Sequence, residues 1–323
     1  FVYAITVLRS VRAEDEVATN LEDAAATALP GFVPQLSLLV AFGLMALSVA
    51  VLVYFLNHIP ASIRINTVLK DIGARLLTDI EARFPDPNTG QRAGTAPDGS
   101  PITARETGYV QAISFSRLER IAQRENGKLK LAVRTGDFVH PKVVIAYWAD
   151  MDVVEDCPDA DVRECFTLGS MRTPSQDMQF LIDELVEIGL RALSPGINDP
   201  FTAVTAVHWL GAATAELGRR DLTRSYASNG EEPRVVLLED DFEHFVSRGF
   251  GAMRGGLANN RIAAQVAFEA MVDAASTLDD ETRRETLARE GNLLMLQARE
   301  HLVGPELDMV EARYQRFLQD IER

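Results

Sequence analysis

The most distinctive polar run of the sequence extends from Ser194 to Pro200 and reads SPGINDP. A rigid turn of this composition, with a helix N-terminus behind it, could bind an anion or line the mouth of a pore. The binding residues would then be Ser194, Pro195, Gly196, Asn198 and Asp199. A sharp connection between two helices requires the same residue types, with Asp as cap and Pro at the first helical position. We favour this structural interpretation of the run.

Two histidines are candidates for metal binding. His244 follows Asp240 and Asp241 by four and three residues, so a helix would place an acid and the imidazole on one face. A di-iron helical bundle needs two such acid-histidine units and further glutamates, and the sequence offers one unit. His208 shares a helical face with apolar residues and is expected to be packed. We therefore predict no metal site and no cofactor.

An acidic run from Asp150 to Cys165 carries seven acids and one base, Arg163. It lacks the glycine of a calcium-binding loop, so a solvated acidic loop is expected. Cys157 and Cys165 fit no redox or zinc motif by their spacing, and free thiols are expected.

The remaining glycine-rich segments match no catalytic motif. The stretch from Gly136 to Val139 is similar to the turn of lipoyl and biotinyl carrier domains, but Lys142 lacks the flanking residues of a carrier lysine. We therefore reject a carrier function and expect only that this part of the chain folds as a small β-barrel. The stretch from Gly249 to Gly256 lacks the Gly-Lys-Ser/Thr ending of a phosphate loop. Neither a nucleophile elbow nor a zinc-protease motif occurs, so we expect that the protein is not an enzyme.

The overall charge excludes one class of partner. The chain has 323 residues, and 47 acidic residues against 32 basic ones give a formal net charge of −15. Such a chain repels phosphate backbones, so we expect no nucleic-acid partner. Two cysteines also exclude a disulfide-rich secreted scaffold.

One apolar run decides the broad class of the protein. From Leu36 to Leu56 the chain has 21 residues without a charge, and a helix needs about 20 residues to span a bilayer. We predict a transmembrane helix over residues 36–59. The apolar opening of the chain predicts the tail of another membrane helix, followed by an extracytoplasmic loop, within residues 1–35.

The flanking charges predict how this helix is oriented. Residues 14–35 carry five acids and no Lys or Arg, whereas Arg64, Lys70, Arg75 and Arg83 follow the span. By the positive-inside rule, the chain after the span lies in the cytoplasm.

Residues 60–104 are predicted to be a juxtamembrane amphipathic helix and a linker. Apolar residues recur every three or four positions from Ile65 to Ile80, and residues 85–104 are rich in Pro and Gly. The apolar stripe of the helix could pack on the soluble domain, lie on the bilayer or line an oligomer interface.

The rest of the chain is predicted to form two cytoplasmic parts. Residues 105–172 are expected to be a small β-rich, barrel-like module. Its predicted strands are 109–114, 128–134 and 139–148, with a helix over 115–124. Residues 173–323 are expected to be a helical domain. Its first helix would start with a capping box formed by Thr173 and Gln176. Further helices are expected to start at Asp199 and to cover about 240–254, 258–277, 280–302 and 305–322.

Four segments carry a resemblance to a known family. They are Gly108–Ile113, Thr135–Val139, Arg172–Asp177 and Ala192–Pro200. Together they resemble a bacterial family of predicted membrane proteins, domain of unknown function twenty-two fifty-four, over residues 1 to about 240. The resemblance implies several membrane helices before a cytoplasmic part, and hence a multi-pass protein of the bacterial inner (plasma) membrane. It implies no activity, substrate or catalytic residue.

We therefore expect a fold that joins membrane α-helix to a cytoplasmic α+β region. The first function hypothesis is a homo-oligomeric channel or transport-like protein with a cytoplasmic domain. The alternative is a membrane-anchored scaffold or sensor whose helical domain docks a protein partner. The expected partners are the lipid bilayer, further copies of the chain and a cytoplasmic protein.

Overall fold

The computed structural model describes residues 2–11, 33–62, 65–84, 99–150, 158–222, 225–226, 233–238 and 241–321. The chain divides into two compact units, Phe1–Arg64 and Ile65–Arg323. Most of the acidic loop expected before the span lies outside the described residues, as do Cys157 and Asp240.

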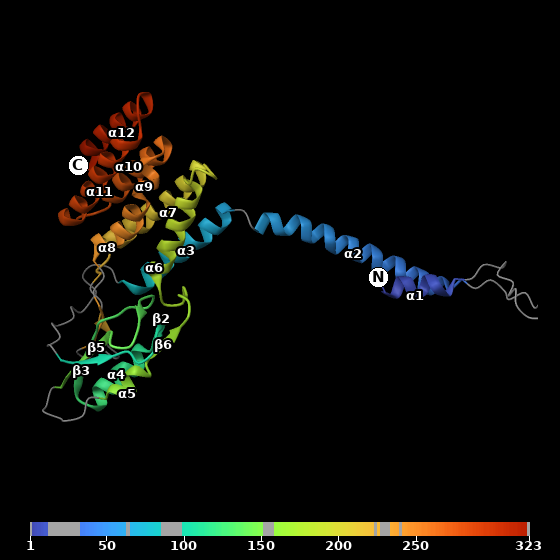
Figure 1. Ribbon diagram of the computed structural model, residues 1–323, viewed down its shortest axis with the longest axis horizontal. Coiled ribbons are helices and arrows are strands. Elements are labelled where there is room, and N and C mark those ends of the chain that lie inside the picture. The colour runs from blue at the N-terminus through green and yellow to red at the C-terminus, as the bar shows by residue number, and fades with distance from the viewer. Residues whose placement is uncertain are drawn as a thin grey trace, which may run out of the picture. The chain divides into compact units, whose positions relative to one another are not determined.

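The first unit consists of α1 (Val2–Ser10) and α2 (Gln35–Ser62), which pack against each other (Figure 1). Within α2, the stretch Gln35–Tyr54 is long and apolar enough to cross a membrane, with a mean hydropathy of 2.7. None of this stretch is buried, whereas the core helix of a soluble domain is mostly buried. A helix that is apolar on every face and exposed on every face matches the membrane helix predicted from the sequence.

The second unit contains a helical part with one hydrophobic core. Its elements are α3 (Ile65–Arg83), α6 (Met178–Ala192), α7 (Pro200–Arg219), α8 (Phe242–Val246), η1 (Ser247–Gly251), α9 (Ala252–Ala258), α10 (Arg261–Ala275), α11 (Glu281–His301) and α12 (Pro305–Ile321). The helices expected after residue 240 are confirmed. The one irregularity is η1, a π-helical turn within the glycine-rich stretch.

The helix that follows α2 in the chain packs into this core. Three residues of the apolar stripe of α3, Leu69, Leu76 and Ile80, are fully buried in the core that α3 shares with α6 and α7. At Gly73 the indole of Trp209 lies so close that a Cβ would be 2.2 Å from a ring carbon. Of the three alternatives for the stripe, packing on the soluble domain is therefore correct.

The β-rich module of the second unit is built from two sheets. One has the strand order β1-β5-β3-β8-β7 and the other β4-β2-β6. The strands are β1 (Ser100–Thr103), β2 (Gly108–Ile113), β3 (Gly127–Leu131), β4 (Phe138–Val139), β5 (Val144–Asp150), β6 (Phe166–Gly169), β7 (Ser225–Tyr226) and β8 (Val235–Val236). The helices α4 (Phe115–Arg124) and α5 (Asp159–Arg163) complete it. A second hydrophobic core, with Val110, Leu129 and Trp148 among its members, lies inside this module.

Several predictions for the module are corrected by the structure. Its described strands form two sheets and no closed barrel, so the barrel-like prediction is wrong. The strand expected over 139–148 is two strands in different sheets. Pro141 cannot donate to a ladder, and Lys142 has a φ of 86°, which ends the extended run. The acidic run is partly helical, because α5 lies within it. In addition, β1 forms inside the stretch expected to be a linker, and β8 joins β3 from far along the chain.

The start of α6 also differs from its prediction. The N-cap is Asp177, whose carboxylate accepts a hydrogen bond from the Phe180 N–H, and not Thr173. Gln176, expected to complete a capping box, instead accepts a hydrogen bond from the Ile113 N–H at 3.0 Å. A tertiary bond to a strand has replaced the local one.

Candidate functional site

The run from Ser194 to Pro200 forms the turn between α6 and α7, which we call the α6–α7 turn. The hydroxyl of Ser194 donates to a backbone carbonyl of α6, and Asn198 has a left-handed φ of 48°. The carboxylate of Asp199 accepts from the Thr202 N–H at 3.2 Å and from its hydroxyl at 2.6 Å, which confirms Asp199 as the N-cap of α7. These hydrogen bonds hold the pKa of Asp199 below its ordinary value.

The side chains of Ser194 and Asp199 in the α6–α7 turn therefore make their hydrogen bonds locally. A Cβ built on Gly196 would meet nothing within 4 Å, and Pro195 is exposed. This is what the structural interpretation requires, and a binding role for the turn stays a prediction.

The structure places the two candidate histidines on different helices, His208 on α7 and His244 on α8. The N–H of His244 donates to the Asp241 carboxylate at 2.5 Å, so Asp241 is the N-cap of α8. His208 is exposed on α7, so the expectation that it is packed is wrong. Among the residues that the structure describes, no three His, Cys, Asp or Glu side chains form a group that could hold a metal ion. Cys165 is a buried free thiol, and burial raises its pKa.

Three of the four segments that resemble the family meet at one place, which we call the junction. These segments are Gly108–Ile113, Thr135–Val139 and Arg172–Asp177. Gln176 joins them, because its side chain accepts from the Ile113 N–H at 3.0 Å and its carbonyl accepts from the Thr135 hydroxyl at 2.6 Å. The same carbonyl accepts from the Arg83 guanidinium at 2.6 Å. The junction therefore connects the β-rich module to α3 and α6.

Gly136 shows how closely the segments approach at the junction. Its φ of 95° is strained for any residue with a side chain. Its N–H donates to the Val110 carbonyl at 2.7 Å. A Cβ at this position would lie 2.1 Å from a carboxylate oxygen of Asp177, so only glycine fits.

An ionic network extends from the junction to the π-helical turn. Arg172 donates to the carboxylates of Asp177 and Asp183, with 2.8 Å between its Nε and Asp177 Oδ2. Arg248 of η1 binds Asp183 with two hydrogen bonds, at 2.7 and 2.6 Å. Burial alone would lower the pKa of Arg172, but the hydrogen bonds to Asp183 and Asp177 raise it above its ordinary value. These ion pairs thus hold the start of α6 against the segment that contains Arg172 and against η1.

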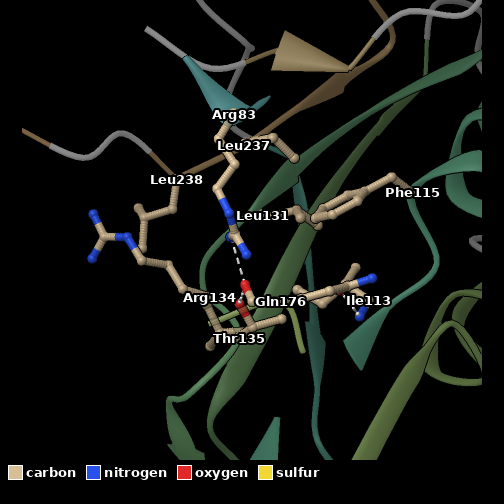
Figure 2. Close-up of a pocket in the computed structure, with 10 residues that line it drawn as sticks. Arg83, Ile113, Phe115, Leu131, Arg134, Thr135, Gln176, Leu237 and Leu238 are labelled. Atoms are coloured by element: carbon tan, nitrogen blue, oxygen red, sulfur yellow. Dashed lines mark hydrogen bonds between the residues drawn. The ribbon is translucent and has the colours of Figure 1, made fainter. Parts of the chain in front are cut away.

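A pocket of about 250 Å³ opens at the junction (Figure 2). Its apolar lining residues are Ile113, Phe115, Leu131, Val133, Leu237 and Leu238, and its polar ones are Arg83, Arg134, Thr135 and Gln176. Figure 2 shows the Arg83 guanidinium directed at Gln176 and Thr135, whereas the Arg134 guanidinium is directed away from them. An apolar wall with a few polar groups, here Arg83, Thr135 and Gln176, is typical of small-molecule sites.

The charge of this pocket is opposite to that of the chain. Its lining includes two arginines and no acidic residue, although the chain carries a net charge of −15. Arg83 also pairs with the Asp79 carboxylate outside the lining, at 3.7 Å. A larger hollow of about 330 Å³ in the β-rich module has no such bias, because Glu106 and Glu164 line it together with Arg105 and Arg163. The pocket at the junction is therefore the described site best suited to an anion.

Sequence reasoning did not find this pocket, because its lining is spread from residue 83 to residue 238. The signal that could have found it was the resemblance itself. Three of the segments that carry the resemblance are the ones that build the junction.

Comparisons with known proteins agree with the membrane assignment. A family model described as "Predicted membrane protein (DUF2254)" matches residues 1–273. The uncharacterized proteins Mb1321c of Mycobacterium bovis and Rv1290c of Mycobacterium tuberculosis are each similar to this chain, with 30% identity over 200 residues. The match covers 59% of this chain and 38% of each relative, so the chain spans less than half the length of these curated relatives. No solved structure matches the chain.

Proposed function

The chain belongs to the DUF2254 family of predicted membrane proteins, and we propose that it is a membrane-anchored sensor for a small organic anion. In this proposal α2 spans the bacterial inner membrane, and the second unit lies in the cytoplasm. The pocket at the junction binds the anion.

The observation that carries the proposal is the contribution of α3 to the pocket. Arg83, at the end of α3, lines the pocket and holds the Gln176 carbonyl. The same helix begins at Ile65, three residues after α2 ends at Ser62. A ligand that binds Arg83 competes with its bond to Gln176, and so acts on the helix that leads to the membrane. Occupancy of the pocket can then favour one arrangement of α3 over another.

The lining defines the chemistry of the ligand. A guanidinium binds a carboxylate or a phosphate through paired hydrogen bonds. The apolar wall, with Phe115 and Leu131, accommodates an apolar body. A volume of about 250 Å³ accommodates a compact body such as one aromatic ring. We therefore expect a small anion whose charged group is attached to an apolar one.

Titration calorimetry on the full chain in lipid nanodiscs tests this proposal. Phenyl phosphate and benzoate are the probes. The controls are inorganic phosphate, which has the charge without the apolar group, and benzyl alcohol, which has the aromatic ring without the charge. Phenyl phosphate is expected to bind more tightly than either half. The variant Arg134→Gln should weaken that binding about tenfold, because a charge-assisted hydrogen bond contributes about 1.5 kcal/mol. The backbone N–H of Arg134, which donates to Asp137, is unchanged in this variant.

Two further variants make the test specific. Leu238→Trp should fill the pocket and abolish binding, whereas Arg105→Gln, in the other hollow, should leave binding unchanged. Equal losses in Arg134→Gln and Arg105→Gln would contradict a site at the junction. The absence of binding by both anions would contradict the sensor proposal as a whole.

The homo-oligomeric channel or transport-like role stays a prediction, as does the docking of a protein partner. The candidate span Gln35–Tyr54 carries no acidic or basic side chain, although such side chains commonly mark transport pathways. The mass of the protein in detergent, measured by light scattering, tests the channel. A closed oligomer of three or more subunits would support it, and a monomer would not.

A further inference from the structure

The helical part of the second unit exposes apolar side chains around the start of α3 and the α6–α7 turn. They are Ile65, Val68, Leu190, Ile197 and Phe201. Ile197 is 55% exposed and Phe201 is 70% exposed. Exposed apolar side chains are common on soluble domains, so the meaning of these depends on where they lie.

Facing residues show that α3 and α7 run parallel. The indole of Trp209 packs on Gly73, and the guanidinium of Arg220 donates to the Phe84 carbonyl at 3.4 Å. At both points the facing positions differ by 136 residues. The same offset places the first residue of α3 beside the second residue of α7. The start of α3 and the α6–α7 turn therefore lie at one end of the helical part (Figure 1).

Chain connectivity limits how far this end can lie from the membrane when α2 spans it. Eleven residues lead from Tyr54, the last residue of the candidate span, to Ile65, and α2 remains helical as far as Ser62. Eight helical residues and three extended ones reach at most about 22 Å. The headgroup layer takes up about 5–7 Å of this distance. The opposite end of the helical part is not held by this tether, because α7, with 20 residues, is about 30 Å long.

We propose that the α6–α7 turn and the first turn of α7 insert Ile197 and Phe201 into the interfacial layer of the bilayer that α2 spans. The proposal rests on α2 as a span and is independent of the pocket. Aromatic and aliphatic side chains are stabilised at this depth. The carboxylate of Asp199 is already satisfied by Thr202, which lowers the cost of bringing it to the headgroups. Lys70 is exposed near the start of α3 and can reach lipid phosphates.

Spin-label depth measurements on the full chain in vesicles test the proposal. The vesicles contain phosphatidylethanolamine and phosphatidylglycerol. Cys157 and Cys165 are first replaced by Ser and Ala, and the thermal midpoint of this parent is compared with that of the wild type. Single labels are then placed with Ile197→Cys and Phe201→Cys. The ratio of oxygen accessibility to that of a water-soluble nickel complex reports the depth of each label.

Two control labels bracket the measurement. Met171→Cys is a matched aqueous control. Met171 is 69% exposed, close to the 70% of Phe201, but it precedes the N-terminus of α6, whereas the α6–α7 turn follows the C-terminus of that helix. Leu47→Cys reports the interior of the candidate span. The labels at 197 and 201 are expected to give ratios several-fold above that at 171 and below that at 47. Two label positions keep the test valid if one variant fails to fold.

Three outcomes would overturn the proposal. The first is a water-like ratio at both 197 and 201. The second is dipolar broadening between copies at these labels without lipid-like accessibility, which would show that a second chain covers the turn. The third is a water-like ratio at 47, which would show that α2 does not span the bilayer.

Discussion

The junction and the α6–α7 turn contain the same residue types, but at the junction these residues contact distant elements and at the turn they contact only their own surroundings. Each contains an aspartate that caps a helix and a nearby glycine, and each comes from a segment that resembles the family. At the junction Asp177 is 2% exposed and binds Arg172, and Gly136 is crowded by that carboxylate. At the turn the Asp199 carboxylate accepts hydrogen bonds from Thr202, within the first turn of its own helix, and Gly196 faces open space.

This difference shows that residue type determines whether a helix cap forms. Contacts with distant elements determine how much the stability of the domain depends on that cap. The junction is stabilised by contacts between elements, so its changes should affect the whole domain. The α6–α7 turn is stabilised locally, so its changes should affect the surface alone. The predictions that follow compare matched substitutions at the two regions.

Replacing the capping aspartates by asparagine should give the largest difference. Asparagine caps a helix about as well as aspartate, so Asp199→Asn should change the free energy of unfolding by less than about 0.5 kcal/mol. Asp177→Asn also removes a buried charge partner of Arg172 and should destabilise by about 3 kcal/mol. Thermal unfolding of the full chain in detergent, followed by circular dichroism, measures both. Equal losses at the two sites would refute the comparison.

Adding a methyl group to each glycine should give the next largest difference. Gly136→Ala forces a side chain into a left-handed backbone position, which costs about 1–3 kcal/mol. It also displaces the Asp177 carboxylate. Gly196→Ala meets no neighbour and should change stability by less than about 0.5 kcal/mol. The same unfolding measurement applies, and a stable Gly136→Ala variant would contradict the geometry of the junction.

Acidification should reveal the smallest effect, at the α6–α7 turn. The hydrogen bonds from Thr202 lower the pKa of folded Asp199. Its carboxylate therefore stabilises the fold above the ordinary aspartate pKa of about 3.9, and this contribution is lost as pH falls through the lowered value. The wild type should then lose more stability than Asp199→Asn over this acidic window, by less than about 1 kcal/mol. Identical pH profiles would show that the cap does not contribute.

Local chemistry was readable in the sequence, and long-range pairing was not. The helix over 115–124, the amphipathic helix α3 and the cap at Asp199 were all predicted, because each depends on residues within one or two turns. The cap at Asp177 was missed. The sequence predicted a capping box with Gln176, but the Gln176 side chain accepts a hydrogen bond from the Ile113 N–H, 63 residues away. The same reason hid the pairing of β8 with β3 and the pocket itself.

Hydrogen–deuterium exchange of the full chain in nanodiscs, with and without phenyl phosphate, tests the central claim most directly. A ligand bound at the junction should slow amide exchange around Thr135 and Gln176 and at the end of α3 near Arg83. Exchange in the α6–α7 turn should stay unchanged. Protection of the turn with none at the junction, or no protection at the end of α3, would contradict an anion sensor that acts on the helix leading to the membrane.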